Sequence, residues 1–283
     1  MPTFLEKLEA AGNAAKSLVC VGLDPDPALM PIPDVADFNK AIVDATADLA
    51  CAYKPNIAFY EALGLPGLRA LEQTVAHIRQ AAPKAVVICD AKRGDIGSTS
   101  AAYAKALFGV WGFDAATVNP YLGKDGVQPF LDYAGHGVFI LCRTSNPGAR
   151  DFQDLRVSNE AVGATHASPL PLYESVARAV LSWNAKNNAA LVVGATYPEE
   201  LRRVRALCPD LPFLIPGVGS QGGDLEQSVR FGTDASGRRA VVNSSRGIIY
   251  ASKGKDFPEA ARRATQQMRD GINAALAAEG KGW

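Results

Sequence analysis

Several features that mark particular classes of protein are missing from this sequence. Its 29 Lys and Arg residues balance 29 Asp and Glu residues, so no net charge points to a nucleic-acid partner or a membrane surface. No apolar run approaches the length of a membrane span, and the charged stretch Met1 to Glu9 does not resemble a signal peptide. We therefore expect a cytoplasmic protein with neither a nucleic-acid nor a membrane partner.

Residues that bind metals or form disulfides are also scarce. The three histidines fall on a predicted helix or in predicted loops, which disfavours a His-based metal site: His77, His136 and His166. The five cysteines are an odd number without a CxxC pair, and most lie in apolar runs: Cys20, Cys51, Cys89, Cys142 and Cys208. We predict free, buried thiols in a reducing compartment and no metal site.

What the sequence does have is a regular alternation of strand and helix patterns. Short apolar runs predict eight strands, at 17–24, 51–56, the start of 85–99, 114–120, 137–143, 189–194, 212–219 and 239–244. Amphipathic segments between them predict helices, among them 37–49, 65–82, 125–133 and one from Pro169 to about Lys186. Between the fifth strand and that last helix lies a long polar loop, 144–168.

Eight such repeats predict an α/β protein with a (β/α)₈ TIM-barrel fold. We expect one domain over 1–283, with a short N-terminal helix closing the bottom and an amphipathic C-terminal helix from Phe257. A doubly wound open sheet is the competing fold. It is disfavoured because no GxGxxG follows the first strand and no linker marks a second domain.

The third predicted strand ends in three charges, Asp90, Lys92 and Asp95. Side chains two apart on a strand share a face, so Asp90 and Lys92 are expected to point the same way. If that face is the inside of a barrel, a carboxylate and an ammonium group lie side by side where charge is costly. Asp95 follows Gly94 and is expected in the loop beyond the strand.

The other strand ends carry further polar residues, and active sites of such barrels lie at these ends. The rim comprises Asp24, Lys54, Asp90, Lys92, Asn119, 143–145, 216–223 and 244–246. The loops after strands seven and eight are glycine-rich and include Arg246, which suits phosphate binding. Structural roles are the alternatives: Asp24 as a turn cap, Lys54 as a surface lysine, Asp95 as a helix cap and the glycine loop as a tight turn.

These residues, taken together, resemble the orotidine 5′-phosphate decarboxylase family. The stretch Asp90-Ala-Lys-Arg-Gly-Asp95-Ile resembles its DxKxxDI signature, which related sugar-phosphate decarboxylases share in part. The resemblance extends in order over nearly the whole chain, through Gly22-Leu-Asp24, 54–61, 144–148, 216–223 and Ser245-Arg246. The segments 119–125 and 144–168 resemble the longer bacterial branch, and their contacts stay open.

The resemblance implies decarboxylation of orotidine 5′-phosphate (OMP) to uridine 5′-phosphate (UMP), without a cofactor. It assigns an alternating charge network to Lys54, Asp90, Lys92 and Asp95, with Lys92 protonating a carbanion at C6. It also implies a homodimer in which Asp95, Ile96 and Thr99 complete the neighbouring site. The remaining substrate contacts that it implies are Asp24 with the ribose, Ser145 with the pyrimidine, and Gln221 and Arg246 with the phosphate.

Two other functions stay open at this point. One is a Mg²⁺-dependent sugar-phosphate decarboxylase of the same barrel type, although Lys54 has no obvious role in it. The other is a catalytically silent nucleotide-binding barrel, against which the complete set of four charged residues argues.

Overall fold

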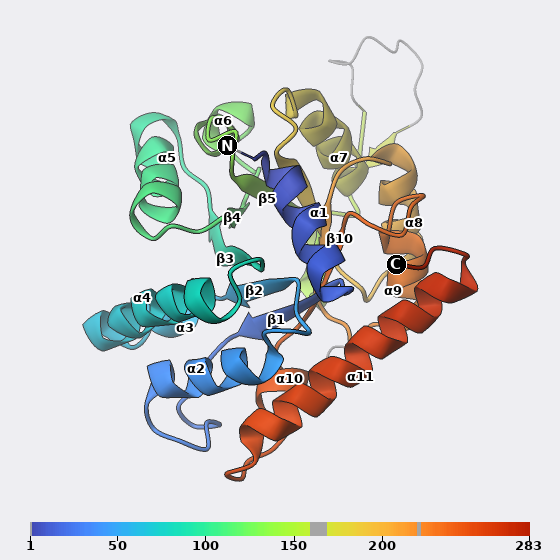
Figure 1. Ribbon diagram of the computed structural model, residues 1–283. Helices are drawn as coiled ribbons and strands as arrows, with labels where there is room; N and C mark the ends of the chain where they lie inside the picture. The colour runs from blue at the N-terminus through green and yellow to red at the C-terminus, as the bar shows by residue number, and fades with distance from the viewer. Residues whose placement is uncertain (1, 159–168, 220–221) are drawn as a thin grey trace.

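Eight parallel strands form a closed barrel in the computed structural model, which describes residues 2–158, 169–219 and 222–283 (Figure 1). Their order around the barrel is β1-β10-β9-β8-β5-β4-β3-β2, which confirms the predicted TIM barrel. The strands are β1 (Val19–Leu23), β2 (Ala52–Pro55), β3 (Val86–Arg93), β4 (Ala115–Val118), β5 (Gly137–Arg143), β8 (Ala189–Val193), β9 (Phe213–Ile215) and β10 (Ala240–Ser244).

Helices surround this barrel as amphipathic segments whose apolar faces pack on the strands. The C-terminal helix carries the predicted apolar stripe, with Phe257, Ala261 and Ile272 buried. The helices are α1 (Phe4–Ala15), α2 (Val35–Thr46), α3 (Ile57–Glu61), α4 (Gly64–Ala81), α5 (Gly97–Ala104) continued by the π-helix η1 (Lys105–Val110), α6 (Lys124–Leu131), α7 (Leu172–Trp183), α8 (Pro198–Leu207), α9 (Leu225–Gly232), α10 (Arg246–Ile249) and α11 (Phe257–Ala278).

The inside of the barrel is filled at one end by the N-terminal helix. Phe4 and Leu8 of α1 pack in one buried cluster with inward-facing strand residues such as Ile88 and Phe139. Phe4 lies edge-on to Phe139, with ring centroids 5.8 Å apart, and a Cβ on Gly137 would sit 2.4 Å from the Phe4 ring. Figure 1 shows α1 crossing in front of the strands. Side chains of α1 therefore occupy this end of the barrel interior.

The polar segment after β5 has more structure than predicted. It contains a short 3₁₀ helix, η2 (Pro147–Asp151), and then β6 (Arg156–Val157), which pairs antiparallel with β7 (Leu170–Pro171). The prediction that the next helix begins at Pro169 is therefore wrong, because the chain first pairs with β6 and α7 starts at Leu172. Likewise α2 starts at Val35 rather than at position 37, because Asp34 caps it by accepting the Asp37 N–H.

All five cysteines are free and buried as predicted, and two of the three histidines have aromatic or acidic neighbours. His77 contacts Asp44 at 2.6 Å, and His136 stacks on Phe108 with ring centroids 4.7 Å apart; His166 lies outside the described residues. Among the described helices, none has the length and apolar content needed to cross a membrane.

Candidate active site

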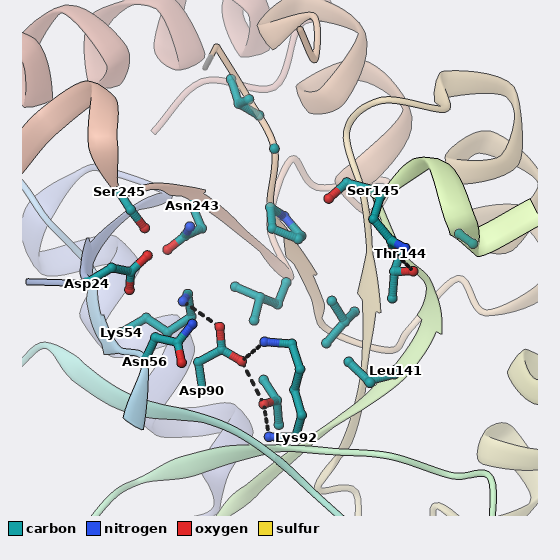
Figure 2. Close-up of a pocket in the computed structure, with 18 of the residues that line it drawn as sticks. Asp24, Lys54, Asn56, Asp90, Lys92, Leu141, Thr144, Ser145, Asn243 and Ser245 are labelled. Atoms are coloured by element: carbon teal, nitrogen blue, oxygen red, sulfur yellow. Dashed lines mark hydrogen bonds and ion pairs between the residues drawn. The ribbon is translucent and has the colours of Figure 1, made fainter. Parts of the chain in front are cut away.

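A cavity of about 520 Å³ opens at the C-terminal ends of the barrel strands. Its walls come from every strand of the barrel or from the loops that follow them, so residues far apart in sequence meet there (Figure 2). Six of the residues to which the resemblance assigns a role line it: Asp24, Lys54, Asp90, Lys92, Ser145 and Arg246.

The centre of the cavity is a carboxylate held between two ammonium groups. Asp90 on β3 accepts a hydrogen bond from Lys54 Nζ of β2 at 2.8 Å through Oδ2. Its other oxygen, Oδ1, accepts from Lys92 Nζ at 2.6 Å. Figure 2 shows the Asp90 carboxylate lying between the two lysine side chains. The predicted contact between Asp90 and Lys92 is thus present.

The two lysines differ in their surroundings. Lys54 is 3% exposed, whereas the Lys92 side chain is 50% exposed and reaches from the strand end into the cavity. Lys54 therefore acts as a fixed internal charge beneath Asp90. Lys92 is the ammonium group that a bound molecule can approach.

Neighbouring opposite charges keep Asp90 and Lys54 ionised. Burial by itself would raise the pKa of Asp90, but the Lys54 and Lys92 ammonium groups outweigh it and hold this pKa well below its usual range. Burial would lower the pKa of Lys54, but the negative charges of Asp90 and Asp24 raise it above its ordinary value. Asp90 and Lys54 therefore both stay charged across the neutral pH range.

We predict that Asp90→Ala destabilises the fold by about 3–5 kcal/mol, because it leaves the buried Lys54 charge without its nearest partner. The measurement is urea unfolding at neutral pH. Since the folded-state pKa of Asp90 is lowered, its contribution is present above its unfolded-state pKa of about 4 and is lost as the pH falls. The difference between variant and wild type should therefore shrink in acid.

A matched control is Asp132→Ala, which breaks the exposed pair between Asp132 and Lys186 at 2.9 Å. This surface pair should contribute less than about 1 kcal/mol. Equal losses in the two variants would contradict a stabilising role for the buried pair.

Two polar side chains near Lys54 leave a hydrogen-bond acceptor unused within the described residues. Asp24 and Asn243 each have a buried Oδ1 atom without a partner there, and both side chains line the cavity beside Ser245 (Figure 2). Gly22 allows this corner to pack, since a Cβ at that position would lie 1.8 Å from Ser245 Oγ. Both acceptors can receive hydrogen bonds from hydroxyl groups of a bound molecule.

The opposite side of the cavity is made by the loop after β5. Ser145 lines the cavity, and its carbonyl accepts the Thr196 hydroxyl at 3.1 Å. Gln153 stabilises this loop by accepting the Thr144 N–H at 2.9 Å and by donating to the Thr144 hydroxyl at 2.9 Å.

The predicted phosphate loops also reach the cavity rim. Gly217 has a φ of 94° and Gly219 a φ of 75°, values that favour glycine, and Gly223 N–H donates to the Gly217 carbonyl at 3.1 Å. Arg246 is exposed at the start of α10. Gln221 lies outside the described residues, so its predicted phosphate contact stays a prediction.

Comparison with known proteins identifies the family of this barrel. The sequence model of the orotidine 5′-phosphate decarboxylase / HUMPS family matches residues 17–264. The chain belongs to this family.

Individual members of the decarboxylase family match along almost the whole chain. The orotidine 5′-phosphate decarboxylase of Dehalococcoides mccartyi is 52% identical over 271 residues, which cover 95% of this chain and 97% of that protein. The protein of the same name from Roseiflexus castenholzii is 50% identical, with 97% and 99% covered. Among solved structures, the Leishmania donovani OMP decarboxylase aligns with a TM-score of 0.83 at 37% identity, covering 97% of this chain and 99% of that one.

Three of the residues to which the resemblance assigns a role do not line the cavity of their own chain: Asp95, Ile96 and Thr99. Asp95 Oδ1 accepts the N–H of Ile96 at 2.8 Å, but Ile96 and not Asp95 is the N-cap residue of α5, and no side-chain cap bond is formed to its first turn among the described residues. The alternative role of Asp95 as a helix cap is therefore wrong. Ile96 is 58% exposed and Thr99 lies exposed in the first turn of α5, so this segment is open to a neighbouring molecule.

Two residues predicted at the rim point elsewhere. Asn119 lies one residue beyond β4 and accepts the Tyr121 N–H at 3.0 Å, so it shapes a turn. Arg143 is fully buried and stacks over Tyr197, 4.0 Å from the ring centroid. The pairing of β5 with β8 shifts between Leu141 and Arg143, and this bulge turns Arg143 away from the cavity that Leu141 lines.

Several residues that line the cavity of this decarboxylase-family chain were not predicted from the sequence. The most central is Thr117, which donates to Asp90 Oδ1 at 2.9 Å and accepts the Lys92 N–H at 2.9 Å. The sequence does contain a sign of this role. Thr117 is a polar residue on an apolar strand, and it lies two positions after Ala115, so both side chains face the inside of the barrel. Further lining residues that were not predicted are Leu141, Ala149, Phe152, Gln153, Val192 and Leu214.

Proposed function

We propose that this chain decarboxylates OMP to UMP in the cavity at the strand ends, and that Lys92 supplies the proton. The reaction, a carboxy-lyase step of pyrimidine biosynthesis, follows from full-length similarity to orotidine 5′-phosphate decarboxylases at about half identity. The single observation that supports the assignment of roles is the Asp90 carboxylate between buried Lys54 and accessible Lys92.

The chemistry requires a group that stabilises negative charge at C6 of the pyrimidine. When CO₂ leaves, the bonding electron pair stays on C6, and the ring has no cofactor to take it up. An ammonium group fixed beside C6 stabilises this charge and then donates its proton there. Lys92 fits this role because its Nζ lies in the cavity and is already held in place by Asp90.

Asp90 lies where it would face the leaving carboxylate, but repulsion is a minor part of the rate. Two unit charges near 4 Å repel by about 4 kcal/mol at an effective dielectric constant of 20. That energy corresponds to a rate factor of roughly a thousand, which falls well short of a large enzymic acceleration. Preorganised stabilisation of the carbanion must supply most of the effect, with binding energy from the phosphate helping to assemble the site.

Substrate contacts are assigned to the remaining walls of the cavity. The unpaired Asp24 oxygen suits a ribose hydroxyl, and Ser145 on the opposite wall suits the pyrimidine. Arg246 beside the glycine loop after β9 suits the phosphate, with Gln221 as its proposed partner. Phosphate contacts at this position are common in TIM barrels.

The fourth charged residue is proposed to act across a dimer interface. Asp95, Ile96 and Thr99 do not line their own cavity and lie on an accessible segment just beyond β3. In a twofold dimer the same segment of each subunit would face the other subunit's Lys92. Each active site would then combine three charged residues of one chain with one of its partner.

Free, buried cysteines support a cytoplasmic location for the proposed enzyme. These cysteines form no disulfides, and the reducing conditions of the cytoplasm keep such thiols free.

The direct test is turnover of OMP by purified protein treated with a chelator. We expect loss of the orotate absorbance and formation of UMP, unchanged by the chelator. Lys92→Ala, purified in the same way, controls for contaminating host enzyme. UMP binding without turnover by the wild type would favour the silent barrel, and activity on a sugar phosphate that needs added Mg²⁺ would favour the other decarboxylase.

A further inference from the structure

The strand that carries the reactive lysine is irregular where it passes β4. Cys89 pairs with Ala116 and Arg93 pairs with Val118, so three residues of β3, 90–92, face the single residue Thr117. Lys92 also has a φ of 46°, in the left-handed region that non-glycine residues avoid. Ordinary strand pairing therefore cannot hold the backbone of Lys92 in place.

The Thr117 side chain fills the gap in this ladder. It is 1% exposed on β4 and borders the cavity. Its hydroxyl oxygen accepts the Lys92 backbone N–H at 2.9 Å. An N–H can only donate, so the hydroxyl proton remains available, and it is directed to Asp90 Oδ1 at 2.9 Å.

The same carboxylate oxygen binds the ammonium group of Lys92 at 2.6 Å. One hydroxyl thus connects the backbone of Lys92, through Asp90, to the end of the same lysine side chain. We propose that Thr117 is a positioning residue, whose hydroxyl fixes both the turn at Lys92 and the direction of its ammonium group. This inference rests on the proposed decarboxylation and adds a residue outside the family signature quoted above.

The test compares four side chains at position 117 that differ separately in size and in the hydroxyl group. Thr117→Val keeps the shape of threonine and removes the hydroxyl, whereas Thr117→Ser keeps the hydroxyl and removes the methyl group. Thr117→Ala and Thr117→Ser both lack the methyl group and differ only in the hydroxyl. Comparing them therefore tests the hydroxyl a second time, in a smaller side chain. The measurements are kcat and KM for OMP, UMP affinity and melting temperature.

We expect activity to follow the hydroxyl and not the volume. The Val and Ala variants should lose roughly 10- to 100-fold in kcat, because a small displacement of a reacting group has that effect. Their KM and UMP affinity should change less than about threefold, since no proposed substrate contact is removed. The Ser variant should recover most of kcat.

The outcomes separate this inference from the function on which it rests. An active wild type with an equally active Val variant would overturn the positioning role alone, as would a Ser variant no better than Ala. Equal losses of kcat and UMP affinity would also overturn it, because they indicate general damage to the cavity. An inactive wild type would overturn the proposed decarboxylation and this role with it. If the Val variant fails to fold, the Ser and Ala pair decides.

Discussion

Replacing Lys92 by alanine should reduce the decarboxylation of OMP to a small residual rate. The substitution removes the proposed proton donor, worth about 10²- to 10⁴-fold, and a preorganised positive charge beside the carbanion, worth about 10²- to 10³-fold. The effects of one residue overlap, so we expect a loss of roughly 10⁴-fold in kcat. Single-turnover measurement of UMP formation detects a residual rate of that size.

The fold should survive this change, since Asp90 keeps its bond to Lys54 at 2.8 Å. UMP should still bind in calorimetry, because the proposed ribose, base and phosphate contacts come from other residues. Lys84→Ala is a suitable control, since Lys84 is an exposed lysine just before the start of β3 and does not line the cavity at the C-terminal ends of the strands. A Lys92→Ala enzyme with kcat within tenfold of the wild type would rule out Lys92 as the proton donor.

The fold and the centre of the site could be predicted from local sequence patterns. Buried parallel strands give nearly continuous apolar runs. A charged residue at the end of such a run is difficult to explain by a structural role alone, so it indicates a functional site. Asp24, Lys54 and Asp90 were found in this way, and all three line the cavity. Lys92 was found by strand alternation, although its left-handed backbone departs from a regular strand.

What the sequence could not provide is the register between neighbouring strands. The irregular pairing of β3 with β4 places Thr117 under Lys92, and the shift between β5 and β8 turns Arg143 away from the cavity. Both irregularities lie next to the active site, where bulges commonly re-aim a side chain. Neither leaves a local mark in the sequence, because a bulge depends on how two distant segments pair.

The role of Asp95 is a different kind of question, since a single chain does not contain its proposed partner. Co-expressing Asp90→Asn and Asp95→Asn chains with different tags allows the heterodimer to be purified. If each site takes Asp90 from its own chain and Asp95 from its neighbour, one site of the heterodimer carries both substitutions and the other carries neither. The heterodimer should then show about half of the wild-type activity, although each parent homodimer is inactive.

This recovery distinguishes sharing from a site built within one chain. If Asp95 served its own chain, each site of the heterodimer would carry one substitution and activity would stay at the level of the parents. A heterodimer of Asp90→Asn with Lys54→Ala is the matched control, because both residues line their own cavity and neither site is intact under either arrangement. Recovery in the first pair and none in the second would place the partner's Asp95 beside Lys92. The four charges would then meet only in the dimer, so dissociation should lower activity as loss of Asp95 does.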